Sequence, residues 1–249
     1  MKNRSLGTDG AVILGTTGEA STISMEERTE IIKASVKIVA GAFPIIVGTG
    51  TIETSKTIAL TKHAMECGAD ASLIITPYYV KPPQRALVKH FLAIADAVAL
   101  PLILYNCPGR TGVDLKPETI ALMSSHPMII GVKDATGDIE RVTSIRKQSG
   151  DAFLIYSGED DLACEFVRQG GDGVISVTAN VAPSAMHKYV TYAVFPILYS
   201  VKCRLSLKIS DPPVYHFLNF HDSMITSSKE GKRKEAEDIN DSLIPLHKR

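Results

Sequence analysis

The sequence contains no tryptophan, no surplus of either charge and no long hydrophobic run. Its 27 basic and 27 acidic residues give a formal net charge of zero. That balance argues against binding to nucleic acids or anionic membranes, because both attract a basic surplus. No apolar run approaches the ~20 residues of a membrane-spanning helix, and residues 1–7 have no apolar signal-peptide core. We therefore expect a globular protein without nucleic-acid or membrane partners.

Cysteine and histidine are sparse and scattered. The four cysteines form no Cys-x-x-Cys pair and lie far apart, at Cys67, Cys107, Cys164 and Cys203. This spacing is typical of reduced thiols in a cytoplasmic protein and not of a disulfide framework or a zinc site. The histidines fall singly on expected helices and loops, so we expect neither a metal ion nor another cofactor.

What the sequence has in quantity is short apolar runs. The 249 residues are enough for one large domain with a sizeable core. Buried strands are expected at residues 11–15, 44–49, 71–76, 101–105, 128–133, 152–157 and 173–178. Helices are expected at 25–40, 53–67, 84–98, 118–125, 138–149 and 160–169, and another begins at Pro183.

The regular alternation of strand and helix predicts right-handed βαβ units and one parallel sheet. Seven such strands favour an α/β barrel of the TIM (β/α)8 type over an open, doubly wound sheet. No glycine-rich dinucleotide fingerprint follows the first strand, which weakens the open-sheet interpretation further. The pattern fails from about residue 194 to 228, a segment with no glycine, no glutamate and several aromatic residues.

Lys133 ends one of the expected strands, directly before the small polar residues 134–137. If its ammonium group is buried there, desolvation lowers its pKa and makes the amine nucleophilic. The alternative is an ordinary lysine at a strand end that reaches solvent. In a parallel barrel, functional residues gather at the carboxyl ends of the strands, so the other strand ends decide between the two interpretations.

Three more strand ends carry candidate residues. The turn at 15–19 contains Thr16 and Thr17 and offers N–H groups and hydroxyls to an anion, although ordinary turns look the same. Tyr78 and Tyr79 follow the strand at 71–76, where tyrosines more often belong to a core or an interface. The strand at 101–105 places Tyr105 at the barrel mouth and Arg110 in the loop above. This guanidinium could bind a carboxylate, or could simply be exposed.

A lysine nucleophile, phenols as proton carriers and binding groups for carboxylates suit Schiff-base chemistry on an α-keto acid. The chain resembles the 4-hydroxy-tetrahydrodipicolinate synthase (dihydrodipicolinate synthase) family of pyruvate-dependent class I aldolases, to which N-acetylneuraminate lyase is related. The matching stretches are Gly15–Glu19, Thr76–Tyr79, Tyr105–Gly112, Gly131–Gly137 and Gly173–Asn180. The resemblance covers about residues 7–193 and resumes over 229–248.

The resemblance implies a lyase of lysine and diaminopimelate biosynthesis that condenses pyruvate with L-aspartate 4-semialdehyde. Lys133 would form the imine with pyruvate. Tyr105, Thr16 and Tyr79 would form a proton relay, with Tyr79 reaching into the neighbouring subunit's site across a tight dimer. The expected assembly is therefore a homo-oligomer, which in this family is a dimer of dimers.

The resemblance also implies the residues that bind the substrates. Thr16 and Thr17 would hold the pyruvate carboxylate, and Arg110 would bind the carboxylate of aspartate 4-semialdehyde. The carbonyl of Ile175 would shape the pocket, and Gly158 would lie beside the second substrate. Two other functions stay open: a related pyruvate lyase or aldolase like N-acetylneuraminate lyase, for which Arg110 is the wrong group, and a non-catalytic family member.

The chain differs from the family pattern at four places. We expect the barrel to cover residues 1–193 and to lack its first strand–helix unit and the C-terminal helices. Residues 194–228 would be an aberrant inserted segment, and residues 229–249 would resume the barrel or its C-terminal helix. Lysine-inhibited relatives carry an asparagine and a glutamate where this chain has Ile52 and Lys56. Lys56 would repel a lysine ligand, so we expect no feedback inhibition by lysine.

Overall fold

Seven parallel strands form a single curled sheet in the computed structural model, which describes residues 7–194, 238 and 241. The strands are β1 (Ala11–Ile13), β2 (Ile45–Gly48), β3 (Ala71–Ile75), β4 (Leu102–Asn106), β5 (Ile129–Asp134), β6 (Leu154–Ser157) and β7 (Gly173–Val174). Each pairs with the next in sequence order, so β1 and β7 are the edges of the sheet in this part of the chain. This arrangement confirms the predicted α/β barrel of the TIM type, with seven strands in the described residues.

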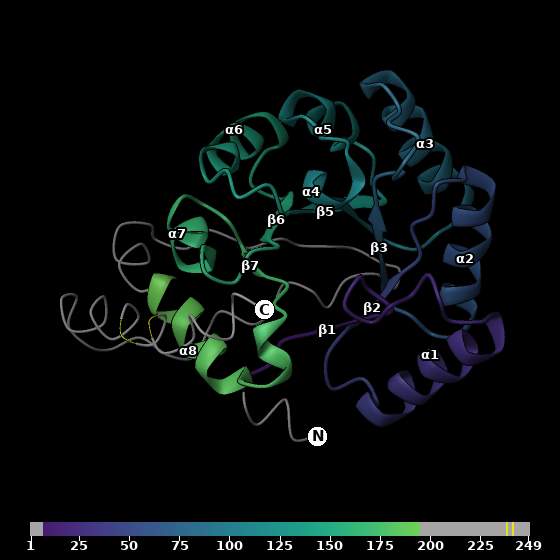
Figure 1. The fold of residues 1–249 in the computed structure, drawn as a ribbon, viewed down its shortest axis with the longest axis horizontal. Helices are drawn as coiled ribbons and strands as arrows, with labels where there is room; N and C mark the ends of the chain where they lie inside the picture. The colour runs from purple at the N-terminus through teal and green to yellow at the C-terminus, as the bar shows by residue number, and fades with distance from the viewer. Residues whose placement is uncertain (1–6, 195–237, 239–240, 242–249) are drawn as a thin grey trace, which may run out of the picture.

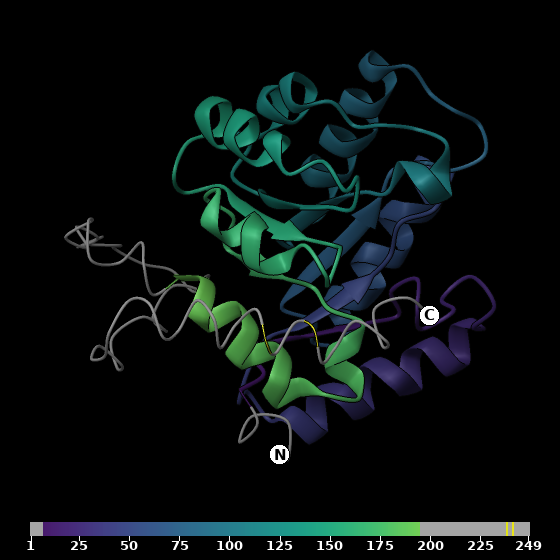
Figure 2. The same cartoon turned by 60° about the vertical axis from the view of Figure 1, so that its left-hand side comes forward.

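Helices surround the outer face of the sheet (Figure 1). They are α1 (Met25–Val39), α2 (Thr54–Glu66), α3 (Gln84–Ala97), α4 (Pro108–Thr111), α5 (Pro117–Met123), α6 (Glu140–Ser149), α7 (Ala163–Arg168), the 3₁₀ helix η2 (Thr178–Asn180) and α8 (Pro183–Val194). Helix α8 lies beside the start of β1 in both ribbon views (Figure 2), and a Cβ atom at Gly7 would overlap the ring of His187. None of these described helices is long and apolar enough to cross a lipid bilayer.

Recognisable sequence signals start two of the helices. Ser24 and Glu27 form the capping box of α1, and Pro117 occupies the first turn of α5. Helix α1 ends at Ala40, which has a left-handed backbone. Gly41 follows with a positive φ as well, so the two residues form the turn together.

The two faces of the sheet bury different sets of side chains. The outer face packs against the helices in two apolar clusters, which include Phe91 and Ile32. The inner face forms a third cluster with Ile46, Leu73 and Tyr105 among its members. Because side chains alternate between faces along a strand, the residues that follow Tyr105 and Lys133 point outward.

The predicted length of the last strand is wrong. Residues 173–178 were expected to be extended, but β7 contains only Gly173 and Val174. The carboxylate of Asp160 accepts the backbone N–H groups of Val177 and Thr178, at 3.1 and 2.8 Å, and so turns the chain into η2. The expected segments 194–228 and 229–249 lie outside the described residues, apart from Val194, Asp238 and Asp241.

Candidate active site

Lys133 lies inside the barrel near the carboxyl end of β5 and is only 9% exposed. Its strand partner on β4 is Tyr105, and the Lys133 Nζ atom lies 4.5 Å from the centre of that ring. Burial lowers the pKa of Lys133, although the nearby acidic groups Asp160 and Glu159 oppose the shift. The amine is therefore easier to deprotonate than an exposed lysine, which is the property a Schiff-base nucleophile needs.

Tyr105 is a buried phenol that stays protonated. Burial raises its pKa most, Cys107 raises it further, and a hydrogen bond with Thr16 and the charge of Arg110 act in the opposite direction. The structure thus places Tyr105 beside both Thr16 and Lys133. A protonated phenol at this position can donate a proton to an oxygen atom beside the lysine.

The turn with Thr16 and Thr17 follows β1 and is exposed. Leu14 enters it with a φ of 54°, and the N–H groups of Gly18 and Glu19 close it on the carbonyls of Gly15 and Thr16. Gly48 is required on the neighbouring strand, because a Cβ atom there would overlap the carbonyl oxygen of Leu14. The turn therefore has a fixed conformation beside the barrel mouth.

Arg110 is exposed on the short helix α4, which directly follows β4. Its charge lowers the pKa values of Tyr105 and Glu159 and contributes to the lowered pKa of Lys133. The guanidinium group therefore lies within electrostatic range of Lys133 and Tyr105.

Gly158 and Ile175 follow β6 and β7 and lie on the same side of the site. A Cβ atom at Gly158 would be 3.0 Å from Lys133 Cε and 2.6 Å from the Cβ atom of Ala135. The N–H of Ile175 donates to the carbonyl of Ser157 at 2.9 Å, and its side chain packs against the inner cluster. Gly158 thus leaves room for the side chain of the lysine.

This close packing makes Gly158→Ala a sharp test of the site. The added methyl group would push against Ala135 and the lysine stem, and such overpacking costs about 1–3 kcal/mol. We expect a lower free energy of unfolding and slower reaction of Lys133 with an α-keto acid. The double variant Gly158→Ala/Ala135→Gly removes the clash with the Cβ atom of residue 135. Its free energy of unfolding and its rate of reaction at Lys133 should therefore recover in part. Unchanged kinetics in the single variant would contradict this picture.

Tyr79, another predicted site residue, lies at the surface of this chain. Its side chain is 86% exposed, and its backbone has a φ of 68°. A left-handed conformation costs a residue with a side chain about 1–2 kcal/mol. The backbone N–H donates to the carbonyl of Thr111 at 3.3 Å, which fixes this conformation.

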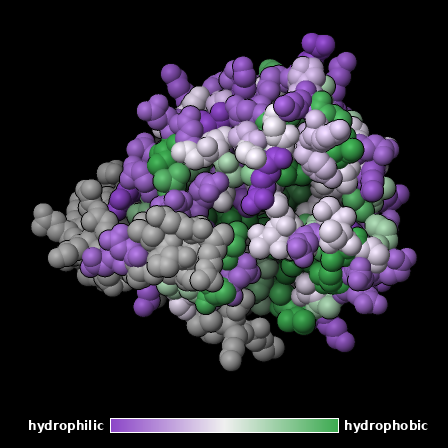
Figure 3. Space-filling view, in the orientation of Figure 1, coloured by the Kyte–Doolittle hydropathy of each residue, from purple (hydrophilic) through white to green (hydrophobic). Residues whose placement is uncertain are grey.

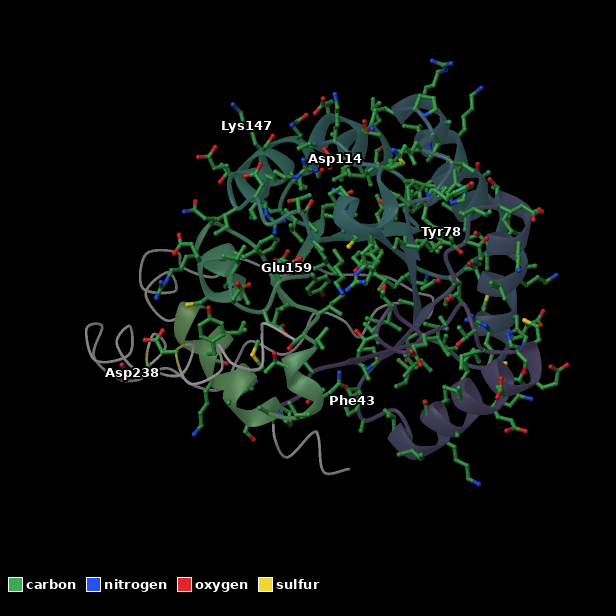
Figure 4. All side chains as sticks on the ribbon, in the orientation of Figure 1. Phe43, Tyr78, Asp114, Lys147, Glu159 and Asp238 are labelled. Carbon is green, nitrogen blue, oxygen red and sulfur yellow. The ribbon has the colours of Figure 1, made fainter. Side chains whose placement is uncertain are left out.

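Sequence reasoning missed two groups in the site. Burial and the charge of Asp161 raise the pKa of Glu159, whereas Lys133 and Arg110 lower it, so this carboxyl group lies within electrostatic range of both cations. Figure 4 shows Glu159 inside the ring of helices. The signal was available, because residues 158–161 directly follow an expected strand. The second group is Cys107, which lies two residues after Tyr105 and therefore on the same face of the chain.

The surface of the molecule carries both hydrophilic and hydrophobic side chains. In the face shown in Figure 3, hydrophilic side chains dominate the rim, while hydrophobic side chains are visible toward the centre. Among the described residues, no group of three or more histidine, cysteine, aspartate or glutamate side chains could hold a metal ion.

The fold and the site together define a parallel α/β barrel that buries a lysine of lowered pKa against the ring of a tyrosine. The chain belongs to the dihydrodipicolinate synthetase family, whose model matches residues 4–194. This membership agrees with the resemblance found in the sequence motifs.

Individual relatives support the family assignment. The chain is 50% identical over 188 residues to the 4-hydroxy-tetrahydrodipicolinate synthase of Methylococcus capsulatus, covering 76% of this chain and 65% of the relative. It is 43% identical over 242 residues to that of Pseudomonas aeruginosa, covering 97% and 71%. The pyruvate-complexed dihydrodipicolinate synthase of Acinetobacter baumannii has a TM-score of 0.81 at 40% identity, covering 99% of this chain and 73% of that one.

The matches do not extend over the whole length of the relatives. The chain spans 65% of the Methylococcus capsulatus protein and 61% of its relative from Alcanivorax borkumensis. The site residues named above all lie within the matched region, between residues 4 and 194.

Proposed function

We propose that this chain condenses pyruvate with L-aspartate 4-semialdehyde to 4-hydroxy-tetrahydrodipicolinate, through a Schiff base on Lys133. The observation that carries the proposal is the buried Lys133, whose lowered pKa accompanies direct contact with the ring of Tyr105. The names of the relatives support the same reaction. The reaction would take place in the cytoplasm, where cysteine thiols stay reduced.

The chemistry begins when the neutral amine of Lys133 attacks the keto carbon of pyruvate. Tyr105 donates a proton to the oxygen, water leaves and an imine forms. The imine withdraws electrons, so the methyl group loses a proton and the resulting enamine attacks the aldehyde carbon of the second substrate. The amino group of that substrate then attacks the imine carbon, closes the ring and releases Lys133.

The remaining residues would bind and orient the two substrates. Thr16 and Thr17 would hold the pyruvate carboxylate at the turn after β1, and Thr16 would pass protons to and from Tyr105. Arg110 would bind the carboxylate of aspartate 4-semialdehyde at the site entrance. Ile175 would contribute its carbonyl, and Gly158 would leave space for the second substrate.

Tyr79 would complete the relay in the site of a second copy of this chain. Its exposed ring and left-handed backbone support this role, because strain is usually kept where it serves a function. Two apolar side chains in the loops after β2 and β3 are also exposed, Ile52 at 46% and Val80 at 55%. A dimer would cover them. Sedimentation should then show a dimer or a dimer of dimers, and full activity of a monomer would contradict the role of Tyr79.

Trapping with borohydride tests the proposal directly. The protein is incubated with pyruvate, reduced, and analysed by intact mass and peptide mapping, with an intact relative as the positive control. We expect one reduced adduct, located on Lys133. An unmodified chain under conditions that modify the relative would identify this protein as a non-catalytic family member.

Lysine should not inhibit the reaction. Lys56 is exposed on α2, and Ile52 lies in the preceding loop, where inhibited relatives are expected to carry polar or acidic groups. An ammonium group at Lys56 repels the ammonium of a lysine ligand. A rate assay with lysine in the millimolar range should therefore match the assay without it, and the variant Lys56→Glu tests whether charge alone restores binding.

A further inference from the structure

A group of charged side chains lies on the outer side of the sheet, behind Lys133. Asp134 follows the lysine on β5, so its carboxylate points away from the barrel interior, and the residue is only 4% exposed. Its Oδ2 atom accepts hydrogen bonds from Arg141 Nε and from Asn106 Nδ2, both at 3.3 Å. A buried carboxylate of this kind depends on such partners, because they replace the water it has lost.

Asn106 occupies the equivalent position on β4, directly after Tyr105. It is fully buried and pairs with Asp134 in the register of the two strands. Its Nδ2 atom donates to Asp114 Oδ1 at 2.9 Å, and its Oδ1 atom accepts the N–H of Leu115 at 2.9 Å. The outer side chains of both strand ends thus belong to the same network.

Arg141 joins the parts of this network. It lies in the first turn of α6 and makes ion pairs with Asp114 at 3.1 Å and with Asp134 at 3.3 Å. Its Nη2 atom also donates to the carbonyl of Leu115 at 2.7 Å. One guanidinium group therefore ties the ends of β4 and β5 to the segment that returns from the helix of Arg110. Figure 4 shows Asp114 near the ends of α5 and α6.

We propose that Arg141 is a positioning residue that holds the ends of β4 and β5 in the alignment that places Lys133 against Tyr105. This role rests on the proposed Schiff-base function. Without the guanidinium group, the carboxylates of Asp114 and Asp134 face each other with no cation between them, and the buried one loses its charged partner. The strand ends then shift, and a shift of about 1 Å at reacting groups can slow a reaction by about 100-fold.

The same helix supplies a matched control. Arg146, in the last turn of α6, makes an equally dense network, with an ion pair to Asp172 at 2.6 Å and a hydrogen bond to the carbonyl of Phe153 at 2.6 Å. These partners precede β7 and β6, so Arg146 holds the amino ends of strands, away from Lys133. Arg146→Met should therefore reduce stability without changing the reacting pair.

The kinetic test compares Arg141→Met, Arg141→Lys and Arg146→Met. Each is mixed with pyruvate and quenched with borohydride over time, and the rate constant and the half-saturating pyruvate concentration are measured. We expect Arg141→Met to lower the rate constant about 10- to 100-fold with little change in half-saturation. Arg141→Lys should recover part of the rate, and Arg146→Met should match the parent. Equal rates for Arg141→Met and Arg146→Met would overturn the inference.

Amide hydrogen exchange gives a second readout that needs no reaction. Arg141→Met should exchange faster than the parent in peptides that cover residues 103–107 and 131–136, whereas Arg146→Met should not. If the parent itself forms no adduct, the proposed function fails, and the exchange pattern still decides whether Arg141 aligns these strand ends. If Arg141→Met does not fold, the trapping kinetics and the hydrogen exchange are both measured on Arg141→Lys instead.

Discussion

The variant Lys133→Met should form no pyruvate adduct and should unfold at a higher temperature than the parent. The loss of the adduct follows because methionine has no amine to attack the keto carbon. The gain in stability follows from burial, which lowers the pKa of Lys133 in the folded chain. A lowered pKa means that folding disfavours the ammonium, even though the ring of Tyr105 and nearby acidic groups attract it. Methionine has a similar length and no charge to desolvate.

The stability difference between Lys133→Met and the parent should depend on pH in a definite direction. In the unfolded chain Lys133 has the ordinary lysine pKa of 10.5, so between the lower folded value and 10.5 the unfolded state binds more protons. The stability of the parent therefore rises with pH through this window, and the full penalty is present below it. The difference in melting temperature between variant and parent should shrink as the pH approaches 10.5. Thermal unfolding at a series of pH values measures it.

Lys147→Met is the matched control for this experiment. Lys147 is exposed on the outer side of α6, as Figure 4 shows, so its ammonium keeps its water. The same substitution there should leave the adduct on Lys133 intact and change the melting temperature little. If Lys133→Met were less stable than the parent at every pH, the ammonium would be stabilised in the fold, and the argument for a reactive amine would be lost.

The barrel itself could be predicted because its local signals agree with one another. The apolar runs that became β3, β4 and β5 are buried on both faces, and buried strands of this kind read as continuous apolar sequence. The end of the sheet could not be predicted in the same way. The chain leaves β7 after Val174 because Asp160, on another loop, binds the N–H groups that an extended strand would direct elsewhere. A contact between distant residues overrode the local pattern.

The same distinction applies to the site. The positions of Lys133, Tyr105 and Thr16 followed from one rule, that the carboxyl ends of parallel strands meet. The network of Arg141 follows from no such rule, because an arginine in the first turn of a helix usually reaches solvent, and only the packing of α6 brings it to Asp134. Tyr79 is a different case, because its proposed role concerns a second copy of the chain. Within this chain the residue has a left-handed backbone and an exposed side chain.

Tyr105→Phe should slow adduct formation by about 10²- to 10⁴-fold, the usual loss when a positioned proton donor is removed. The substitution keeps the ring that lies 4.5 Å from Lys133 Nζ, so the packing around the amine is preserved. Only the hydroxyl group is lost. Because burial holds its pKa far above the working pH, this group is a proton donor in the resting protein. Its hydrogen bond to Thr16 contributes about 1 kcal/mol, so the variant should stay folded.

Tyr156→Phe separates this chemical role from a general effect on the barrel interior. Tyr156 pairs with Lys133 on the adjacent strand β6, and burial, Asp172 and Asp9 raise its pKa to about 12. The acidic groups that raise its pKa, Asp172 and Asp9, precede β7 and β1 at the amino ends of those strands. Stopped mixing with pyruvate, followed by reduction and mass analysis, should show slow trapping in Tyr105→Phe and near-parent trapping in Tyr156→Phe. Equal losses in both variants would mean that the site needs two intact buried phenols for its packing, and that Tyr105 is not the proton carrier.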